Sequence, residues 1–308
     1  MSPDVCVIGE INPDLILYGL PRQLEPEREI LADGFRLTLG SSSAIFAHNL
    51  SALGTKVGMI SKVGTDPLGK IALDRLVAGG VDISHVRTSP DTPTGVTVIL
   101  AQPDSRFILT YPGTMFELSY DDLDFDYIFS ARHLHLSSFF LHRALRPRIA
   151  EIFRTAKSRS LTTSLDTNDD PEDKWDGNLD EVLRSIDILF VNEREAKKIA
   201  RADDLNSALV KLTQIARLAV VKLGAKGAIA REGSKEWRCP SLAMNAIDTV
   251  GAGDSFDAGY IHRFLQGESQ EDCLQYANTA GAFSTTKEGG TEAFRDRASV
   301  ARFFRGRP

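Results

Sequence analysis

The feature that most constrains the fold is a regular alternation of short apolar runs and helical segments over residues 133–223. Apolar runs of strand length occupy 133–136, 161–166, 187–192 and 218–223. Apolar residues recur at helical spacing in the segments between them, at 145–159, 179–184, 193–200 and 205–216. Parallel strands need a crossover connection, usually a helix, so this alternation predicts a mostly parallel sheet covered by helices on both faces.

The first half of the chain follows the same alternation, with two interruptions. Strands are expected at 5–8 and 57–63, and helices at 42–53 and 67–78. The stretches 12–39 and 92–112 instead indicate antiparallel strands around polar turns. We expect these two stretches to pair into one small sheet outside the main one. The sequence therefore predicts a single α/β domain over 1–308, with a lid formed by segments at about 12–39 and 92–112.

Composition excludes several classes of protein. The 308 residues carry 42 acidic and 36 Lys and Arg side chains, and this net charge of −6 argues against a nucleic-acid partner. No run approaches the roughly 18 apolar residues of a membrane span, and no basic leader precedes the first strand. Three widely spaced cysteines predict neither a disulfide framework nor a zinc site, and they favour a cytoplasmic location.

The segment 246–266, AIDTVGAGDSFDAGYIHRFLQ, carries the clearest chemical signal. Phe256, Tyr260 and Phe264 recur every four residues, which predicts an amphipathic helix beginning just after Gly253. A glycine-rich turn before a helix gathers unpaired N–H groups and the positive end of the helix dipole, which favours an anion. Asp254 is then either an N-cap or a carboxylate within reach of an attacking hydroxyl. The small residues 251–253 favour the second interpretation, because a phosphate must approach the backbone closely.

Other patterns are weaker. The stretch from Gly64 to Lys70 has the spacing of a phosphate-binding P-loop, but Ile71 stands where a magnesium-binding hydroxyl is needed. Residues 40–44 lack the second glycine of a hydrolase nucleophile elbow. His133 and His135 alternate along one strand without a third ligand, which favours core histidines over a metal site.

The sequence DTVGAGDSF at 248–256, followed by Ala258 and Gly259, resembles the signature of the ribokinase/PfkB family of carbohydrate kinases. Further resemblances follow along the chain: GEINPD at 9–14, KVGTDPLG at 62–69, PTGVTVIL at 93–100, VNEREA at 191–196 and VKLGAKG at 221–227. The resemblance implies a Rossmann-like three-layer α/β sandwich, of the ribokinase-like type, with a small β-sheet lid. It also implies phosphoryl transfer from ATP with Mg²⁺.

The resemblance implies roles for particular residues on the phosphate side. Asp254 is the catalytic base, and the anion hole is formed by Gly251, Ala252 and Gly253. Asn192 and Glu195 organise Mg²⁺ and the phosphates. The adenine and ribose are enclosed by Lys222, Gly224 and Gly227, with Asn278 either contacting the base or serving as a polar helix residue. Asp248 and Val250 match positions that hold a monovalent cation such as K⁺ in some members.

On the substrate side, the resemblance assigns Asn12 and Asp14 to the sugar hydroxyls. Further substrate contacts are expected from Gly40, Ser41, Ser42, Thr94, Phe107 and Ser137. Phe107, Phe139 and Phe140 either pack in the lid and core or stack on a ring of the substrate. The chain departs from the family at Ile45, where an asparagine commonly contacts the sugar. It departs again at Asp169, because in the family an arginine often follows the DxN element that Asp166 and Asn168 match. The second departure disfavours an acidic substrate such as a ketodeoxygluconate.

The main hypothesis is an ATP-dependent kinase that phosphorylates a primary hydroxyl of a small sugar. A nucleoside kinase of the same superfamily is the alternative, because Phe107, Phe139 and Phe140 are apolar and the sugar-contacting asparagine is lost. A catalytically silent sugar or nucleotide sensor is a third hypothesis, against which the retained Asp254 argues. The partner is then a small molecule, not a nucleic acid or a membrane, and two lids pairing would give a homodimer.

Overall fold

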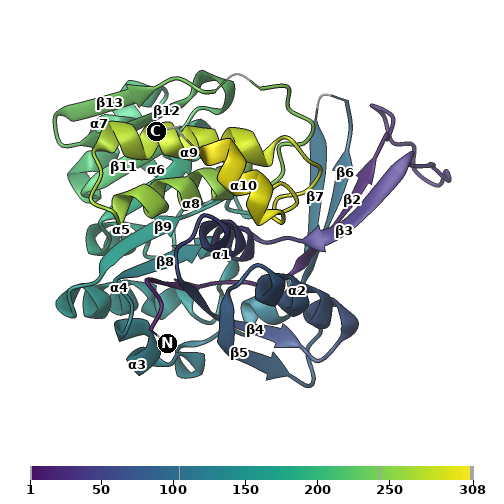
Figure 1. Ribbon diagram of the computed structural model, residues 1–308, viewed down its shortest axis with the longest axis horizontal. Helices are drawn as coiled ribbons and strands as arrows, with labels where there is room; N and C mark the ends of the chain where they lie inside the picture. The colour runs from purple at the N-terminus through teal and green to yellow at the C-terminus, as the bar shows by residue number, and fades with distance from the viewer. Residues whose placement is uncertain (1, 104, 243, 306–308) are drawn as a thin grey trace.

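Within residues 2–103, 105–242 and 244–305, which the computed structural model describes, two sheets organise the chain (Figure 1). The larger sheet has nine strands in the order β13-β12-β11-β10-β9-β8-β1-β4-β5. Their bounds are β1 (Val5–Ile8), β4 (Val57–Gly64), β5 (Asp82–Ser89), β8 (His133–Ser137), β9 (Thr162–Asp166), β10 (Ile188–Asn192), β11 (Leu218–Lys222), β12 (Ala228–Glu232) and β13 (Lys235–Cys239). Pairs from β5 to β11 are parallel, and β12 and β13 add antiparallel strands at one edge. The predicted mostly parallel sheet is confirmed.

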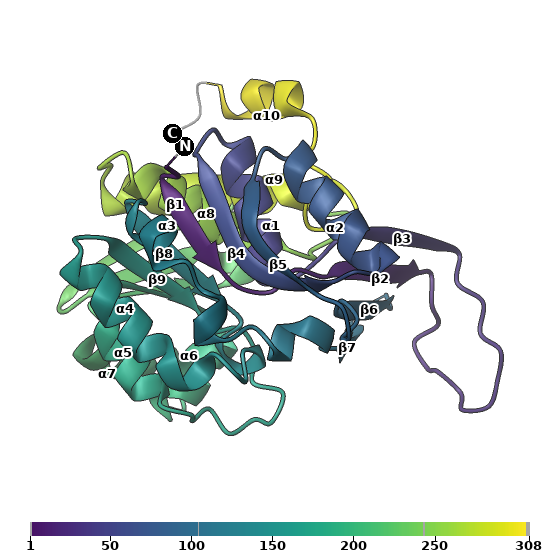
Figure 2. The same ribbon diagram turned by 90° about the horizontal axis from the view of Figure 1, so that it is seen from below.

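Helices cover both faces of this sheet, which gives the expected three layers (Figures 1 and 2). One face carries α1 (Ser42–Ala52), α2 (Pro67–Ala78), α8 (Ala252–Phe264) and α9 (Gln270–Ser284). The other carries α3 (Phe125–Phe129), α4 (Ile149–Ser158), α5 (Leu179–Ser185), α6 (Glu193–Ala200) and α7 (Leu205–Ile215). Each layer buries its own apolar cluster against the sheet, as expected for strands buried on both faces. The last helix, α10 (Arg297–Phe304), packs its phenylalanines against Phe283 and Phe294.

The two interrupting stretches form the second sheet, as predicted. It contains β2 (Pro13–Tyr18), β3 (Gly34–Leu39), β6 (Val96–Ala101) and β7 (Arg106–Tyr111), in the order β3-β2-β6-β7. The inner face, which includes Asp14 and Tyr18, is turned toward α8, because the Tyr18 hydroxyl donates to Asp248. Side chains alternate along each strand, so Phe35 and Phe107 lie on the outer face. We call this sheet the lid.

Several elements differ from the expectation. Helix α8 begins at Ala252 rather than after Gly253, because Gly251 adopts the left-handed conformation and serves as the N-cap. The helix expected over 145–159 begins as a 3₁₀ turn at Arg146–Arg148 and becomes α-helical at Ile149. Strands β5, β12 and β13 were not anticipated. In the described part of the chain, no helix has the length and apolar character needed to cross a membrane.

Candidate active site at the carboxyl edge of the large sheet

The first turn of α8 leaves main-chain donors without partners. Gly251 has φ of 70°, and a Cβ on it would lie 2.6 Å from the Cα of Gly290, so only glycine fits. Within the described residues, the N–H groups of Gly253 and Asp254 have no hydrogen-bond acceptor. These donors and the positive end of the α8 dipole point to the same place, which is the arrangement that binds an anion.

Asp254 is the third residue of α8, and its side chain is buried. The N-cap interpretation is wrong, because Gly251 occupies that position. Burial raises the pKa of Asp254 to about 6, and the negative charge of Asp166 adds to the effect. The charge of Lys222 and a hydrogen bond from Ser42 act in the opposite direction. The carboxylate is therefore still ionised at neutral pH and is basic enough to accept a proton.

Lys222 ends β11 and points under α8. Its ammonium donates to Asp166 Oδ2 at 2.6 Å and to Asp257 Oδ2 at 3.0 Å. A Cβ built on Gly253 would lie 3.4 Å from Lys222 Nζ, so the ammonium borders the first turn of α8. The side chain thus lies on the phosphate side of the edge, not with the glycines Gly224 and Gly227 assigned to adenine and ribose.

Asn192 and Glu195 form a reciprocal cap at the start of α6. Asn192 Oδ1 accepts from the Glu195 N–H at 2.9 Å, and the Asn192 N–H donates to Glu195 Oε2 at 2.8 Å. Burial raises the pKa of Glu195 to about 7, and the charge of Asp166 adds to the effect. The motif therefore serves the helix as a capping box while keeping a buried acid near Asp166.

Gly227 and Asn278 both contact the end of β13. A Cβ on Gly227, whose φ is 93°, would lie 2.0 Å from the Cys239 carbonyl oxygen. Asn278 Nδ2 donates to the carbonyls of Cys239 at 3.1 Å and Pro240 at 3.2 Å. Asn278 therefore fixes the main chain beside Gly227, and Gly224 lies on the same turn with φ of 58°. Gly227 and Asn278 therefore meet at the end of β13.

Asp14 begins the inner face of the lid and is buried. Burial raises its pKa to about 8, and the negative charge of Asp254 adds to the effect. A Cβ on Gly40 would lie 1.9 Å from Asp14 Oδ1, which explains glycine at that position. Asn12 Nδ2 donates to Thr97 Oγ1 at 3.3 Å, linking the loop before β2 to the lid.

Glu10, which the sequence analysis did not single out, is the centre of a buried polar cluster. Its Oε2 accepts from Ser43 Oγ at 2.8 Å and lies 3.2 Å from His142 Nε2. Its Oε1 accepts from Ser138 Oγ at 2.9 Å. Burial alone would raise the pKa of Glu10, but the hydrogen bond and charge of His142 and the bond from Ser43 lower it overall. The sequence signal that could have identified Glu10 is its place in the GEINPD motif at 9–14.

Three non-glycine residues around this cluster have left-handed backbone conformations: Ser41, Ser138 and Asn168. Ser41 Oγ donates to the Glu10 carbonyl at 2.7 Å and caps α1. The Ser138 N–H donates to Asn168 Oδ1 at 2.9 Å, and Asn168 Nδ2 donates to Ser42 Oγ at 3.0 Å. Such conformations cost free energy and concentrate at functional sites. This chain of bonds reaches Asp254 through Ser42.

Seven residues that the sequence analysis discussed lie elsewhere. Ser137 Oγ is 2.8 Å from His135 Nε2, inside the sheet, whereas its neighbour Ser138 joins the Glu10 cluster. The Thr94 hydroxyl accepts from the Gly64 N–H at 2.8 Å. Phe107 is on the outer face of the lid, on the side opposite Asp14. The aromatic rings that follow β8 pack in the core, as do the strand histidines: Phe139, Phe140, His133 and His135.

Asp248 and Val250 join the lid to α8. Asp248 Oδ2 accepts from the Tyr18 hydroxyl and from the Gly289 N–H, both at 2.9 Å. Asp248 Oδ1 accepts from the Val250 N–H at 2.9 Å. The Val250 side chain packs against Ile16 and Ile99 of the lid. Ile45, at the position of the missing asparagine, lies against Gly251 and Gly290.

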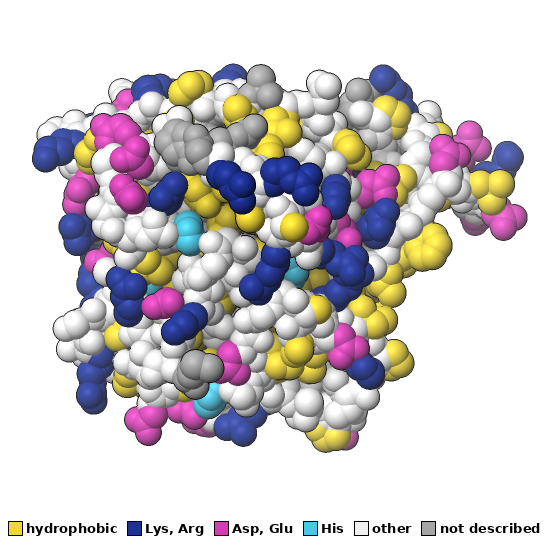
Figure 3. All heavy atoms as spheres, viewed as in Figure 1, with side chains coloured by type: hydrophobic (Ala, Val, Ile, Leu, Met, Phe, Trp, Pro, Cys, Tyr) yellow, Lys and Arg dark blue, Asp and Glu magenta, His cyan; other side chains and the backbone are white. Residues whose placement is uncertain are grey.

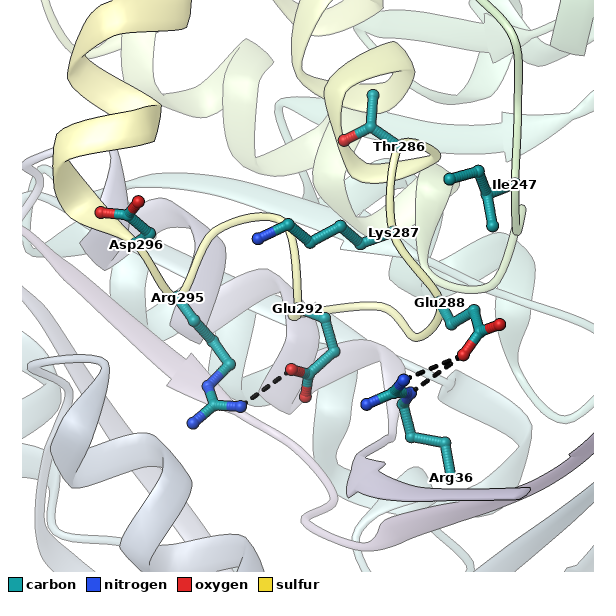
Figure 4. Close-up of a pocket in the computed structure, with 8 residues that line it drawn as sticks. All are labelled: Arg36, Ile247, Thr286, Lys287, Glu288, Glu292, Arg295 and Asp296. Atoms are coloured by element: carbon teal, nitrogen blue, oxygen red, sulfur yellow. Dashed lines mark hydrogen bonds and ion pairs between the residues drawn. The ribbon is translucent and has the colours of Figure 1, made fainter. Parts of the chain in front are cut away.

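A hollow of ≈ 550 Å³ lies apart from this edge, outside the segment that follows α9 (Figure 4). Its charged side chains are largely paired with one another. Arg36 Nη2 donates to Glu288 Oε2, and Arg295 Nη1 donates to Glu292 Oε2, both at 2.9 Å. Lys287 is the exception, because it forms no ion pair with the described residues. The pocket lies outside the group of residues described above, so we assign it no part in the chemistry.

Comparisons with known proteins identify the family of the chain. A family model described as pfkB family carbohydrate kinase matches residues 2–297. An ATP-dependent ribose-1-phosphate kinase from Halopiger xanaduensis is 31% identical over 287 residues, which cover 92% of this chain and 93% of that protein.

Two solved structures share the fold across the whole chain. The ribokinase of Arabidopsis thaliana, complexed with ribose and ATP, is 25% identical with a TM-score of 0.82, covering 98% of this chain and 99% of that one. An Escherichia coli protein proposed to be a ribokinase II, in complex with ATP and Mg²⁺, is 24% identical with a TM-score of 0.86, covering 99% of each chain. The chain belongs to the pfkB family of carbohydrate kinases and is therefore a phosphotransferase with an alcohol group as acceptor.

Proposed function

We propose that the protein transfers the γ-phosphate of ATP to a primary hydroxyl of a small sugar, with Asp254 as the catalytic base. The observation that carries this proposal is the first turn of α8. There, a buried carboxylate with a raised pKa adjoins two unpartnered N–H groups, and its charge raises the pKa of a second buried carboxyl group, Asp14.

Each group has a defined part in the reaction. Asp14 would accept hydrogen bonds from sugar hydroxyls and hold the acceptor against Asp254. Asp254 would take the proton of the attacking hydroxyl as its oxygen bonds to the γ-phosphorus and the bond to ADP breaks. Gly251, Ala252 and Gly253 would stabilise the charge on the transferring group through main-chain donors. Proton abstraction contributes about 10²–10⁴-fold in such reactions.

The site's charge fits Mg²⁺ with ATP. Asp166, Glu195 and Asp257 are buried near a single ammonium, and Asp257 Oδ1 has no partner among the described residues. No group of three or more His, Cys, Asp or Glu side chains in the described chain is arranged to hold a metal alone. Mg²⁺ commonly binds through one or two carboxylates, waters and substrate phosphates, and here Glu195 with Asn192 would hold it. The ion would neutralise phosphate charge.

We propose that the adenosine end of the nucleotide lies against Gly224, Gly227 and Asn278. Glycine at 227 lets the chain pass tightly against Cys239, and Asn278 is committed to main-chain carbonyls. We therefore propose that Asn278 shapes the adenine pocket, and that Asp248 and Val250 form a monovalent-cation site for K⁺ close to the anion hole.

A sugar that already carries a phosphate is a second candidate acceptor. Arg106, on the inner face of the lid, donates to Thr249 Oγ1 at 3.1 Å, and its charge lowers the pKa of Asp14. A cation beside Asp14, the carboxylate proposed to bind the sugar, suits an anionic acceptor. The 31%-identical relative is a ribose-1-phosphate kinase. Ile45 packs against two glycines, so it does not replace the lost asparagine as a sugar contact.

The nucleoside alternative loses its main support. Phe139 and Phe140 are buried in the core, and Phe107 is on the outer face of the lid. That outer face also carries Phe35, Leu109 and Tyr111, each at least half exposed, and hydrophobic side chains gather along the lower margin of the lid in Figure 3. We propose that a second copy of the chain covers this face, giving a homodimer.

The test is a coupled ADP-release assay with pentoses, hexoses, sugar phosphates, keto-acids and nucleosides, each with and without K⁺ and Mg²⁺. We expect turnover with a sugar or sugar phosphate. Turnover only with nucleosides contradicts the sugar assignment, and binding without turnover identifies a sensor. Light scattering across a dilution series, with Leu109→Arg as the variant, tests the dimer.

A further inference from the structure

Lys222 provides the ammonium at the centre of a buried group of three ionisable side chains. Its ammonium is shared by Asp166 and Asp257, whose side chains are 2% and 1% exposed. Removing such charges from water costs several kcal/mol per ion, and apolar residues of similar volume often stabilise a protein as well. Stability alone therefore does not explain a lysine between two carboxylates at this position.

The location of the ammonium points to its use. Lys222 Nζ is 3.4 Å from where a Cβ on Gly253 would be, and the Gly253 N–H is one of the unpartnered donors. Asp257 lies one helical turn after Gly253 on α8, and Asp166 ends β9. The two carboxylates hold the ammonium from two different elements, against the turn that would receive the phosphoryl group. The Lys222 side chain is also 14% exposed, so it is open to the site.

This group of three side chains leaves one acceptor and one donor unused. Asp257 Oδ1 is buried with no hydrogen-bond partner in the described part of the chain. The ammonium has three donors, of which two are used by the carboxylates. One donor therefore remains for an oxygen at the anion hole.

We propose that Lys222 is a catalytic residue that donates this remaining hydrogen bond to a non-bridging oxygen of the transferring phosphoryl group. The inference rests on the proposed function. As the bond between the γ-phosphorus and the ADP oxygen breaks and the bond to the sugar oxygen forms, the sugar proton goes to Asp254. The ammonium stays protonated throughout and neutralises charge on the phosphoryl oxygens. Asp166 and Asp257 act as positioning residues that aim the ammonium.

The principal test is Lys222→Met, with Lys157→Met as the matched control. Lys157 is also ion-paired with a largely buried aspartate, Asp187, at 3.1 Å, but it lies on α4 away from the site. With the acceptor that the wild type uses, we expect Lys222→Met to lower kcat at least 100-fold while KM for ATP changes less than fivefold. The control should stay within twofold of the wild type.

A binding measurement separates a transition-state role from a structural one. ADP with aluminium fluoride and Mg²⁺ mimics the phosphoryl group in transfer. We expect Lys222→Met to bind ADP alone as the wild type does, but to lose at least tenfold of the gain in affinity that aluminium fluoride gives. Lys222→Arg, which keeps the charge, should restore part of that gain.

Defined outcomes overturn the inference. A Lys222→Met variant that keeps turnover within tenfold, or that loses ADP affinity as much as turnover, makes the lysine structural. If that variant does not fold, Lys222→Gln replaces it under the same thresholds, and failure of both to fold also assigns a structural role. A wild-type protein that phosphorylates no acceptor contradicts the proposed function instead, so the two failures are distinguishable.

Discussion

The loop after β1 and the first turn of α8 each bury one carboxylate at the same edge of the large sheet. Glu10 in the loop receives hydrogen bonds on both oxygens, and its pKa is lowered. Asp254 in the turn has few donors, and its pKa is raised to about 6. Burial is common to both, so the number of donors decides whether such a group stabilises the fold or remains available to accept a proton.

The largest effect is expected from Asp254→Asn. The amide cannot accept the proton of the attacking hydroxyl, so kcat should fall about 10²–10⁴-fold. The matched control is Asp180→Asn, another acid in the first turn of a helix, α5, which should keep wild-type turnover. A rate within tenfold of the wild type, measured by coupled assay on folded protein, would remove Asp254 from the role of base.

Glu10→Gln tests the other side of the comparison. Replacing one acceptor oxygen by an amide breaks charge-assisted bonds to Ser43 and His142 in a buried site, so the free energy of unfolding should fall by about 3 kcal/mol. Chemical denaturation measures this change. Glu151→Gln, at an exposed ion pair with Arg148, should leave the unfolding free energy unchanged within error. Equal effects at both positions would show that the Glu10 cluster is not a stabilising centre.

Asp254→Asn should also stabilise the protein. The pKa of Asp254 rises from 3.8 in the unfolded chain to about 6 on folding, so the folded state binds more protons between these values. Wild-type stability therefore falls as pH rises from about 4 to about 6 and stays lower above that. At pH 8 the variant should be more stable by up to about 3 kcal/mol, and the difference should vanish near pH 4. A variant less stable than the wild type at pH 8 contradicts the conclusion that burial destabilises the ionised form of Asp254.

The smallest effect concerns pH. Because Asp254 must be ionised to act as a base, the catalytic rate should drop about tenfold between pH 7 and pH 5. Asp14, Glu10, Asp166 and Lys222 also influence this region electrostatically, so the profile is to be compared with the residual rate of Asp254→Asn. That residual rate should lack the acid limb. An identical limb in both proteins would assign it to another group.

Much of the fold was predictable because parallel strands buried on both faces leave continuous apolar runs. Strand β5 was missed because it is an edge strand with a mixed sequence, and β12 and β13 because they extend the sheet as an antiparallel hairpin. The start of α8 was placed too late, because glycine and alanine within a first helical turn carry no apolar signal.

The sequence predicted which segments meet at the candidate site, but not the directions of their side chains or the part of Glu10. A shift of one residue decides whether Ser137 or Ser138 joins the Glu10 cluster, and no periodic pattern fixes that phase at a strand end. Whether Lys222 points under α8 depends on which carboxylates neighbouring strands bring beside it. The packing of Ile45 against two glycines was not predictable, because it depends on where their two segments meet in the fold.

The bond between Tyr18 and Asp248 gives β2 two duties. Asp14 lies near the start of the strand, and Tyr18, its last residue, donates to Asp248. Asp248 also accepts from the N–H of Val250, the residue before the N-cap of α8. If Asp14 binds the acceptor as proposed, β2 connects it directly to the segment before the anion hole. A sugar that displaced this strand would then also displace the segment that receives the phosphate.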